Sequence, residues 1–194
     1  MLKKVLVKKI LENAINYEWS IQGFGMLRLY LEDEIRLHIW DTRYKIKDVS
    51  IIHTHPWNFH SYVIAGILFN QDWKEVSLDD PFHFGFWRQE IITGEQATAT
   101  PQNKTILVGA IIDKIKYYGE GDTYYQDMTI PHQTCYEDGT VTIIERDSRL
   151  DNNFAYSYWN EEFGPNGWVS AAPRKATEAE ILDIVENSLE KFFY

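Results

Sequence analysis

Three histidines lie close together in one β-rich stretch of the chain. His53 and His55 are separated by a single residue, and His60 follows after a segment that contains Pro56. Because side chains alternate between the two faces of a strand, His53 and His55 are predicted to point the same way and to share one metal ion. A bend at Pro56 would bring His60 back toward them. His132, in another β-like stretch, is the fourth candidate ligand.

The surrounding residues predict a mainly β chain with a helix at each end. Residues 1–20 place apolar side chains at helical spacing, which predicts an amphipathic helix. Thr177 and Glu180 match a capping box, which predicts a closing helix within 176–194. Residues 152–174 are predicted to be irregular. Runs in which apolar and polar residues alternate predict short strands, which are typical of a barrel or sandwich. These runs cover 26–31, 35–40, 49–53, 61–69, 82–92, 104–112, 122–130 and 140–145.

The composition indicates one soluble domain in a reducing compartment. The 194 residues carry a formal net charge of -10, which argues against nucleic acid or an anionic membrane surface as a partner. A single cysteine, Cys135, excludes a disulfide within the chain and fits the cytoplasm. No apolar segment follows the basic residues 1–9, so we expect no signal peptide. We also expect no membrane span, which needs roughly 20 apolar residues.

The histidine segment resembles the first motif of the cupin superfamily, Gly-x5-His-x-His-x3–4-Glu-x6-Gly. Residues 53–66 resemble this pattern from the paired histidines to Gly66, with His60 in place of the glutamate and without the glycine that opens the motif. His132 lies about where the second cupin motif has its histidine. Residues 55–59 are also similar to a little-described group of bacterial and phage cupins related to cysteine dioxygenase. That group carries an His-x-His-Pro-Trp-x-Phe segment and a late Gly-Trp-Val, which residues 167–169 match.

The resemblance implies a fold for the whole chain. A cupin is a double-stranded β-helix, or jelly-roll barrel, so the chain is expected to form a single cupin domain over residues 1–194. The barrel is expected over 24–170, between flanking helices in 1–20 and 176–194. Cupins commonly dimerise through an edge strand, which leaves a homodimer open as an assembly.

The resemblance also implies the metal ligands and their chemistry. His53, His55 and His132 are the expected ligands, and His60 stands where the family has a carboxylate, as a fourth ligand or a catalytic proton carrier. Imidazole ligands suit transition metals such as Fe, Ni, Cu and Zn. Because neutral ligands leave the charge of a divalent metal uncompensated, the site should favour a small anionic substrate, a thiolate or a carboxylate.

Cysteine-dioxygenase-like cupins use a three-histidine site of this kind, which implies an Fe(II) dioxygenase-like oxidoreductase. One divalent transition metal is therefore the expected cofactor, with Fe(II) favoured and Zn, Ni or Mn as alternatives. A metal-dependent isomerase, lyase or hydrolase that uses Zn, Mn or Ni is a second interpretation. A non-catalytic cupin that binds a small molecule is a third.

Arginines in strands are candidates for holding the substrate, because an inward guanidinium can grip a carboxylate with two hydrogen bonds. Four lie in strand-like segments: Arg28, Arg36, Arg88 and Arg146. Arg36 and Arg88 are favoured as substrate-binding residues, with Trp57 and Tyr62 as pocket walls. His38 is expected to have a core or surface role.

Overall fold

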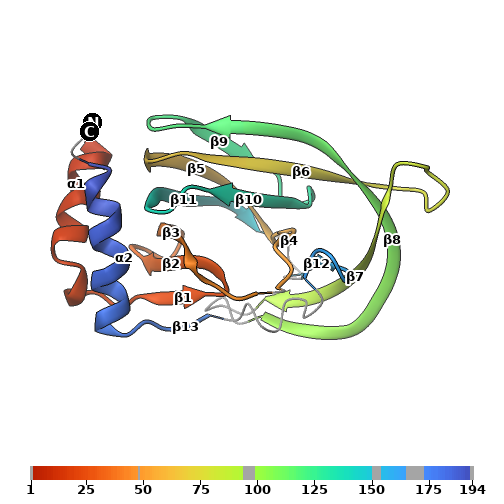
Figure 1. Cartoon of the computed structure of the whole chain (residues 1–194), viewed down its shortest axis with the longest axis horizontal. Coiled ribbons are helices and arrows are strands. Elements are labelled where there is room, and N and C mark those ends of the chain that lie inside the picture. Colours follow the sequence, from red (N-terminus) through yellow and green to blue (C-terminus); the bar gives the residue numbers. More distant parts are fainter. Residues whose placement is uncertain (1, 48, 94–98, 150–153, 165–172, 193–194) are drawn as a thin grey trace.

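The computed structural model describes residues 2–47, 49–93, 99–149, 154–164 and 173–192, and over these ranges the chain is mainly β (Figure 1). Its strands form two antiparallel sheets, one of them closed into a barrel. Helices α1 (Leu2–Glu12) and α2 (Glu178–Glu190) lie near the two ends of the sequence. The structure therefore confirms the prediction of a mainly β fold with a barrel and terminal helices.

Seven strands form the open sheet, in the order β13 (Arg174–Lys175), β1 (Ser20–Gln22), β2 (Phe24–Tyr30), β3 (Ile35–Lys45), β11 (Thr140–Arg149), β5 (Trp57–Ala65) and β9 (Thr123–Gln126). Six others close the barrel, in the order β10 (His132–Tyr136), β4 (Ile52–His53), β12 (Phe154–Trp159), β7 (Phe84–Thr93), β8 (Ala99–Tyr118) and β6 (Leu68–Val76).

Two features of these sheets were not predicted. The strands over 24–170 are shared between the barrel and a separate open sheet, whereas one barrel was expected. The segment predicted to be irregular contains β12, which is a strand because it pairs with β4 on one edge and with β7 on the other. The Gly-Trp-Val motif at residues 167–169 lies outside the described residues.

Strand alternation gives the open sheet two different faces. Leu27 and Leu29 of β2, with Leu37 and Ile39 of β3, pack in one apolar cluster with side chains of both helices. The residues that alternate with them, such as Arg28 of β2 and His38 of β3, point to the other face and line a cavity. The sheet therefore uses one face for the core and leaves the other for function.

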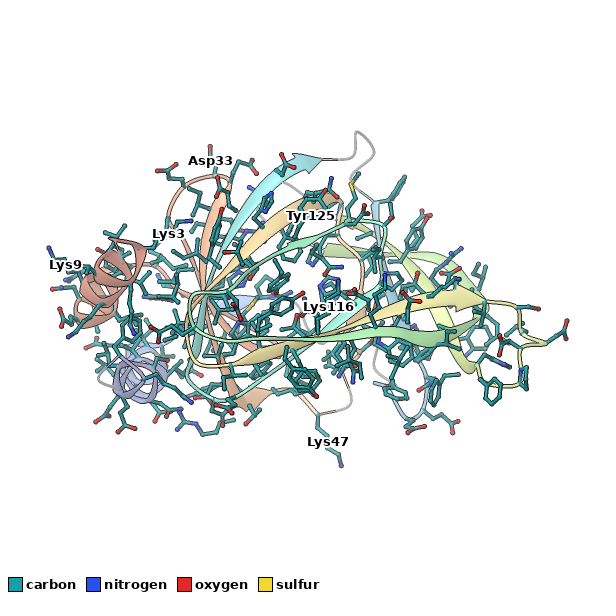
Figure 2. The ribbon with its side chains drawn as sticks, turned by 90° about the horizontal axis from the view of Figure 1, so that it is seen from above. Lys3, Lys9, Asp33, Lys47, Lys116 and Tyr125 are labelled. Atoms are coloured by element: carbon teal, nitrogen blue, oxygen red, sulfur yellow. The ribbon has the colours of Figure 1, made fainter. Side chains whose placement is uncertain are left out.

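The two helices lie side by side at one end of the molecule, where Lys9 of α1 points outward (Figure 2). The capping box predicted for α2 is present. The Thr177 hydroxyl accepts a hydrogen bond from the backbone N–H of Glu180, and the Glu180 carboxylate accepts one from the backbone N–H of Thr177. Helix α1 ends at Glu12, earlier than the predicted limit, and a short 3-10 helix η1 (Ala14–Asn16) follows. Among the described residues, neither helix has the length and apolar character needed to span a membrane.

Candidate metal centre

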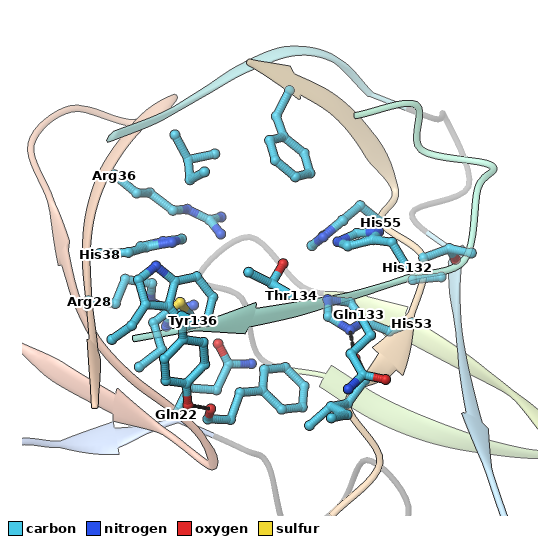
Figure 3. A pocket seen from close by; sticks show the side chains of 18 of the residues that line it. Gln22, Arg28, Arg36, His38, His53, His55, His132, Gln133, Thr134 and Tyr136 are labelled. Atoms are coloured by element: carbon cyan, nitrogen blue, oxygen red, sulfur yellow. Dashed lines mark hydrogen bonds between the residues drawn. The ribbon is translucent and has the colours of Figure 1, made fainter. Parts of the chain in front are cut away.

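Three of the four candidate histidines meet in the cavity between the open sheet and the barrel (Figure 3). Strands β4 and β10 pair antiparallel with His53 directly opposite His132. His55 follows His53 by two residues and lines the same cavity. The spacing of two residues thus brings two imidazoles to one cavity, although His55 lies beyond the end of β4, and the pairing of β4 with β10 supplies the third.

The three imidazoles are close enough to serve one ion. Their ring centroids are 4.8 Å apart for His53 and His55, and 5.0 Å for the other two pairs. One nitrogen from each ring lies within 4.8 Å of the other two. Metal–nitrogen bonds are about 2.0–2.1 Å long, so small ring rotations would bring all three onto one metal. The residues therefore fit a divalent transition metal.

Backbone carbonyls set the tautomer of two of the rings. The Nδ1 atom of His53 lies 3.0 Å from the carbonyl oxygen of Ile51. The Nδ1 atom of His132 lies 3.4 Å from the carbonyl oxygen of Ile130. A carbonyl can only accept, so in the neutral ring Nδ1 carries the proton and donates it. In this tautomer Nε2 is the unprotonated nitrogen, which is the atom that can bind a metal.

Burial keeps all three imidazoles neutral. It lowers the pKa of His53 to about 3, with a further contribution from neighbouring His132. It likewise lowers the pKa of His132 to about 4 and that of His55 well below its usual value. Because only a neutral imidazole can bind a metal, the centre is in its binding form at neutral pH.

Aromatic rings and backbone contacts hold the histidines in place. Trp57 stacks on His55 with centroids 4.3 Å apart, and Phe24 stacks on His53 at 5.0 Å. Between the two histidines, Thr54 donates its backbone N–H to the carbonyl of Tyr156 at 2.9 Å. The Thr54 hydroxyl accepts from the Tyr156 backbone at 2.8 Å. These contacts attach the His-x-His segment to β12 and restrict the rings.

A basic wall faces the histidines across a cavity of about 250 Å³ (Figure 3). Arg28 and His38 are cross-strand partners on β2 and β3, and Arg36 lies on the same face of β3. The Arg36 guanidinium lies between two rings, 4.7 Å from that of Tyr30 and 4.9 Å from that of Trp57. Burial lowers the pKa of Arg36 to about 9. This wall gives the cavity a positive side.

Among the predicted substrate-binding residues, Arg36 and Trp57 line the cavity with the histidines, and Tyr62 and Arg88 do not. The Tyr62 hydroxyl donates to Glu145 at 3.0 Å, and Lys3 lies over the Tyr62 ring. Arg88 forms an ion pair with Glu75 at 2.9 Å and lines a neighbouring cavity.

The structure does not bring His60 into the histidine group. His60 and Phe59 are adjacent on β5, and Phe59 lines the cavity, so His60 points to the opposite face of the sheet. There its ring contacts Tyr125 at a centroid distance of 5.2 Å. The expected bend at Pro56 is present, and strand β5 begins directly after it at Trp57.

Arg28 and His38 belong to the cavity although neither was favoured from the sequence. The sequence pattern that could have identified them is the alternation of Arg36, His38 and Trp40 on one strand, together with the hairpin that pairs β2 with β3. A histidine between apolar neighbours also fits a core position, so alternation alone could not separate the two roles.

Comparison of the chain with models of known protein families found no match, and comparison with curated proteins found none either. The likeness to cupins rests on the motif at residues 53–66, on a closed barrel and on a cluster of three histidines. Membership of the cupin superfamily therefore stays a prediction.

Proposed function

We propose that the chain is a metal-dependent oxidoreductase that uses O2 to oxidise a small anionic molecule. In this proposal His53, His55 and His132 hold one divalent transition metal, with Fe(II) preferred. The observation that carries it is the arrangement within one buried cavity, where three neutral imidazoles face two buried arginines.

The ligand set supports a transition metal rather than magnesium or calcium, which prefer oxygen ligands. Among the described residues that line the cavity there is no Asp or Glu. Three imidazoles leave the charge of a divalent ion uncompensated, so an anionic substrate is favoured at the metal. Fe(II) held there would supply the redox chemistry that O2 requires.

The residues of the chain would bind and orient the substrate. The Arg36 guanidinium is fixed between Tyr30 and Trp57, so its planar fork is already in place to receive an anionic group. Trp57 and Phe59 contact His55 and would exclude water from the side of the cavity that they cover. A dry cavity strengthens each electrostatic contact made within it.

A second candidate function uses a metal without redox chemistry. Three histidines with an open fourth position also form a catalytic zinc site, as in zinc hydrolases and hydratases. The His53–His55–His132 group supports this alternative because the structure brings no fourth ligand to it from the described residues.

Metal analysis together with oxygen consumption separates these functions. The protein is produced in iron-supplemented medium, and its bound metals are measured by mass spectrometry. About one iron per chain, with O2 consumption in the presence of small thiols or carboxylates, supports the O2-dependent oxidoreductase. Tightly bound zinc or nickel, without O2 consumption, favours the second candidate. A folded protein that binds no transition metal contradicts both.

A further inference from the structure

The basic wall of the cavity consists of two arginines and one histidine from a single hairpin. Arg28 and His38 are paired across β2 and β3, and Arg36 lies two residues before His38 on the same face. The three side chains are 4%, 5% and 6% exposed in the order Arg28, Arg36, His38. They face the metal centre across the cavity (Figure 3).

Polar atoms of this wall lack partners. Within the part of the chain that the structure describes, the Nε atoms of Arg28 and Arg36 have no hydrogen-bond partner, and neither has either ring nitrogen of His38. Buried polar atoms are almost always hydrogen-bonded, so a cluster of exceptions at a cavity wall indicates a surface that can bind a ligand. The free groups include N–H donors from both guanidinium ions, which suits an acceptor-rich ligand.

The charges of the wall are also uncompensated. Arg146, which lines the same cavity, forms an ion pair with Glu34 at 2.7 Å. No ion pair is present for Arg28 or Arg36 among the described residues, and no described acidic residue lines the cavity. Two unpaired positive charges are therefore buried side by side in a chain whose formal net charge is -10.

We infer that Arg28, Arg36 and His38 form an anion-binding subsite for a phosphoryl group, at the end of the cavity opposite the three histidines. A phosphoryl dianion matches the two free charges, whereas a single carboxylate neutralises only one. Its three terminal oxygens match three donor groups on the wall. The inference rests on the proposed function for the other end of the substrate, which would lie toward the metal. It identifies the substrate as a small phosphorylated or phosphonate-bearing molecule.

Titration calorimetry of the metal-free protein with inorganic phosphate tests the subsite. At pH 7.5, in a chelating and phosphate-free buffer, we expect saturable binding of one phosphate, at least about tenfold tighter than acetate. Arg28→Gln and Arg36→Gln should each weaken phosphate binding about 10- to 100-fold. Arg88→Gln is the matched control and should bind phosphate as the wild type does, because Arg88 is already paired with Glu75.

A separate variant distinguishes failure of the subsite from failure of the metal centre. His132→Ala should lose metal and retain phosphate binding. Metal binding without phosphate binding overturns the subsite alone, and phosphate binding without metal binding overturns the proposed function alone. The subsite is also overturned if acetate binds as tightly as phosphate. The same holds if Arg88→Gln weakens phosphate binding as much as Arg28→Gln and Arg36→Gln do.

Thermal melting provides a readout that does not require tight binding. Phosphate should raise the melting temperature of the wild type and leave that of Arg36→Gln unchanged. In phosphate-free buffer Arg36→Gln should melt at or above the wild-type temperature, because it removes an unpaired buried charge. A wild-type melting temperature that phosphate does not change contradicts the inference whether or not the variants fold.

Discussion

The orientation of a few imidazole rings determines what the cavity can bind. His53 and His132 each place Nδ1 against the carbonyl two residues earlier in the chain, so both direct Nε2 away from their own strand. Burial keeps the rings neutral. Each histidine is therefore held in the protonation state, and two of them in the tautomer, that a metal requires.

Single ligand substitutions should remove the metal and preserve the fold. His53→Ala and His132→Ala are expected to weaken metal affinity more than about 100-fold, because changes in the partners of ligands alone cost 10–100-fold. Metal content is measured by mass spectrometry after dialysis, and folding by far-ultraviolet circular dichroism.

His60→Ala is the control for these substitutions, because the His60 ring lies on the other face of β5 against Tyr125. It should keep full metal occupancy. If His60→Ala loses the metal as His132→Ala does, the three-histidine centre is incomplete and the expected role of His60 as a ligand is restored.

At the scale of elements, strand pairing and tight turns position the site. The open sheet directs Arg36 and His38 of β3 into the cavity, while Leu37 and Ile39 pack on the other face in the helix-containing core. Loss of register by one residue would exchange these two sets. The turns that help to fix the register therefore also determine which side chains reach the site.

The turn between β5 and β6 depends on Gly66. Its φ is +81°, and a Cβ there would lie 2.6 Å from the Thr140 hydroxyl oxygen and 2.9 Å from the Thr140 Cα. Gly121 has a similar φ of +89° with open space around it. Gly121→Ala should cost about 1–2 kcal/mol of unfolding free energy, from the backbone conformation alone. Gly66→Ala should cost clearly more, because Thr140 must also move.

Urea denaturation of the two variants measures the difference between them. Equal losses of unfolding free energy would mean that Thr140 accommodates the new methyl group without cost. The close approach of Gly66 to β11 would then have no role in setting the turn.

The capping box fixes the start of α2. Thr177→Ala removes the side-chain acceptor for the Glu180 backbone and should lower the unfolding free energy by about 1 kcal/mol. Thr177→Ser keeps the hydroxyl and should remain close to wild type. Chemical denaturation compares the three proteins, and a Thr177→Ser variant as unstable as Thr177→Ala would assign the effect to the lost methyl group.

At the scale of the whole molecule, residues of two sheets line a basic cavity within an acidic protein. The open sheet contributes the arginine wall, and the barrel strands β4 and β10 contribute His53 and His132. Neither sheet alone contains the complete site. Binding a ligand between the sheets should therefore stabilise the folded molecule as a whole.

The metal-free protein should lose stability as the pH falls from about 6.5 toward 4. His53 and His132 have pKa values of about 3 and about 4 when folded, below the usual value of 6.5. In this window the unfolded chain binds protons that the folded chain does not, so acid favours unfolding. Each such histidine contributes a slope of up to about 1.4 kcal/mol per pH unit.

Urea denaturation of chelator-treated protein at several pH values between 7.5 and 5 measures this slope. His132→Ala should have a shallower slope than the wild type, since one of the depressed groups is absent. Identical slopes for the two proteins would show that His132 is not kept neutral by burial.

The amino-acid sequence by itself determined the features that depend on neighbouring residues. Period-two alternation and turn residues predicted a mainly β chain, and Thr177 with Glu180 predicted the closing helix. Alternation also predicted that His53 and His55 share a site, which the structure confirms. These features are local because backbone geometry fixes the direction of a side chain relative to its neighbours in the sequence.

The tertiary structure decided how distant residues join that pair, among them His132, which the resemblance to cupins had already indicated as a ligand. His132 meets His53 through the pairing of β10 with β4, and Arg28 meets His38 through the pairing of β2 with β3. The placement of β5 with Phe59 toward the cavity directs His60 to the opposite face. The physical reason is that strand pairing depends on long-range burial and register, which the local sequence pattern does not encode.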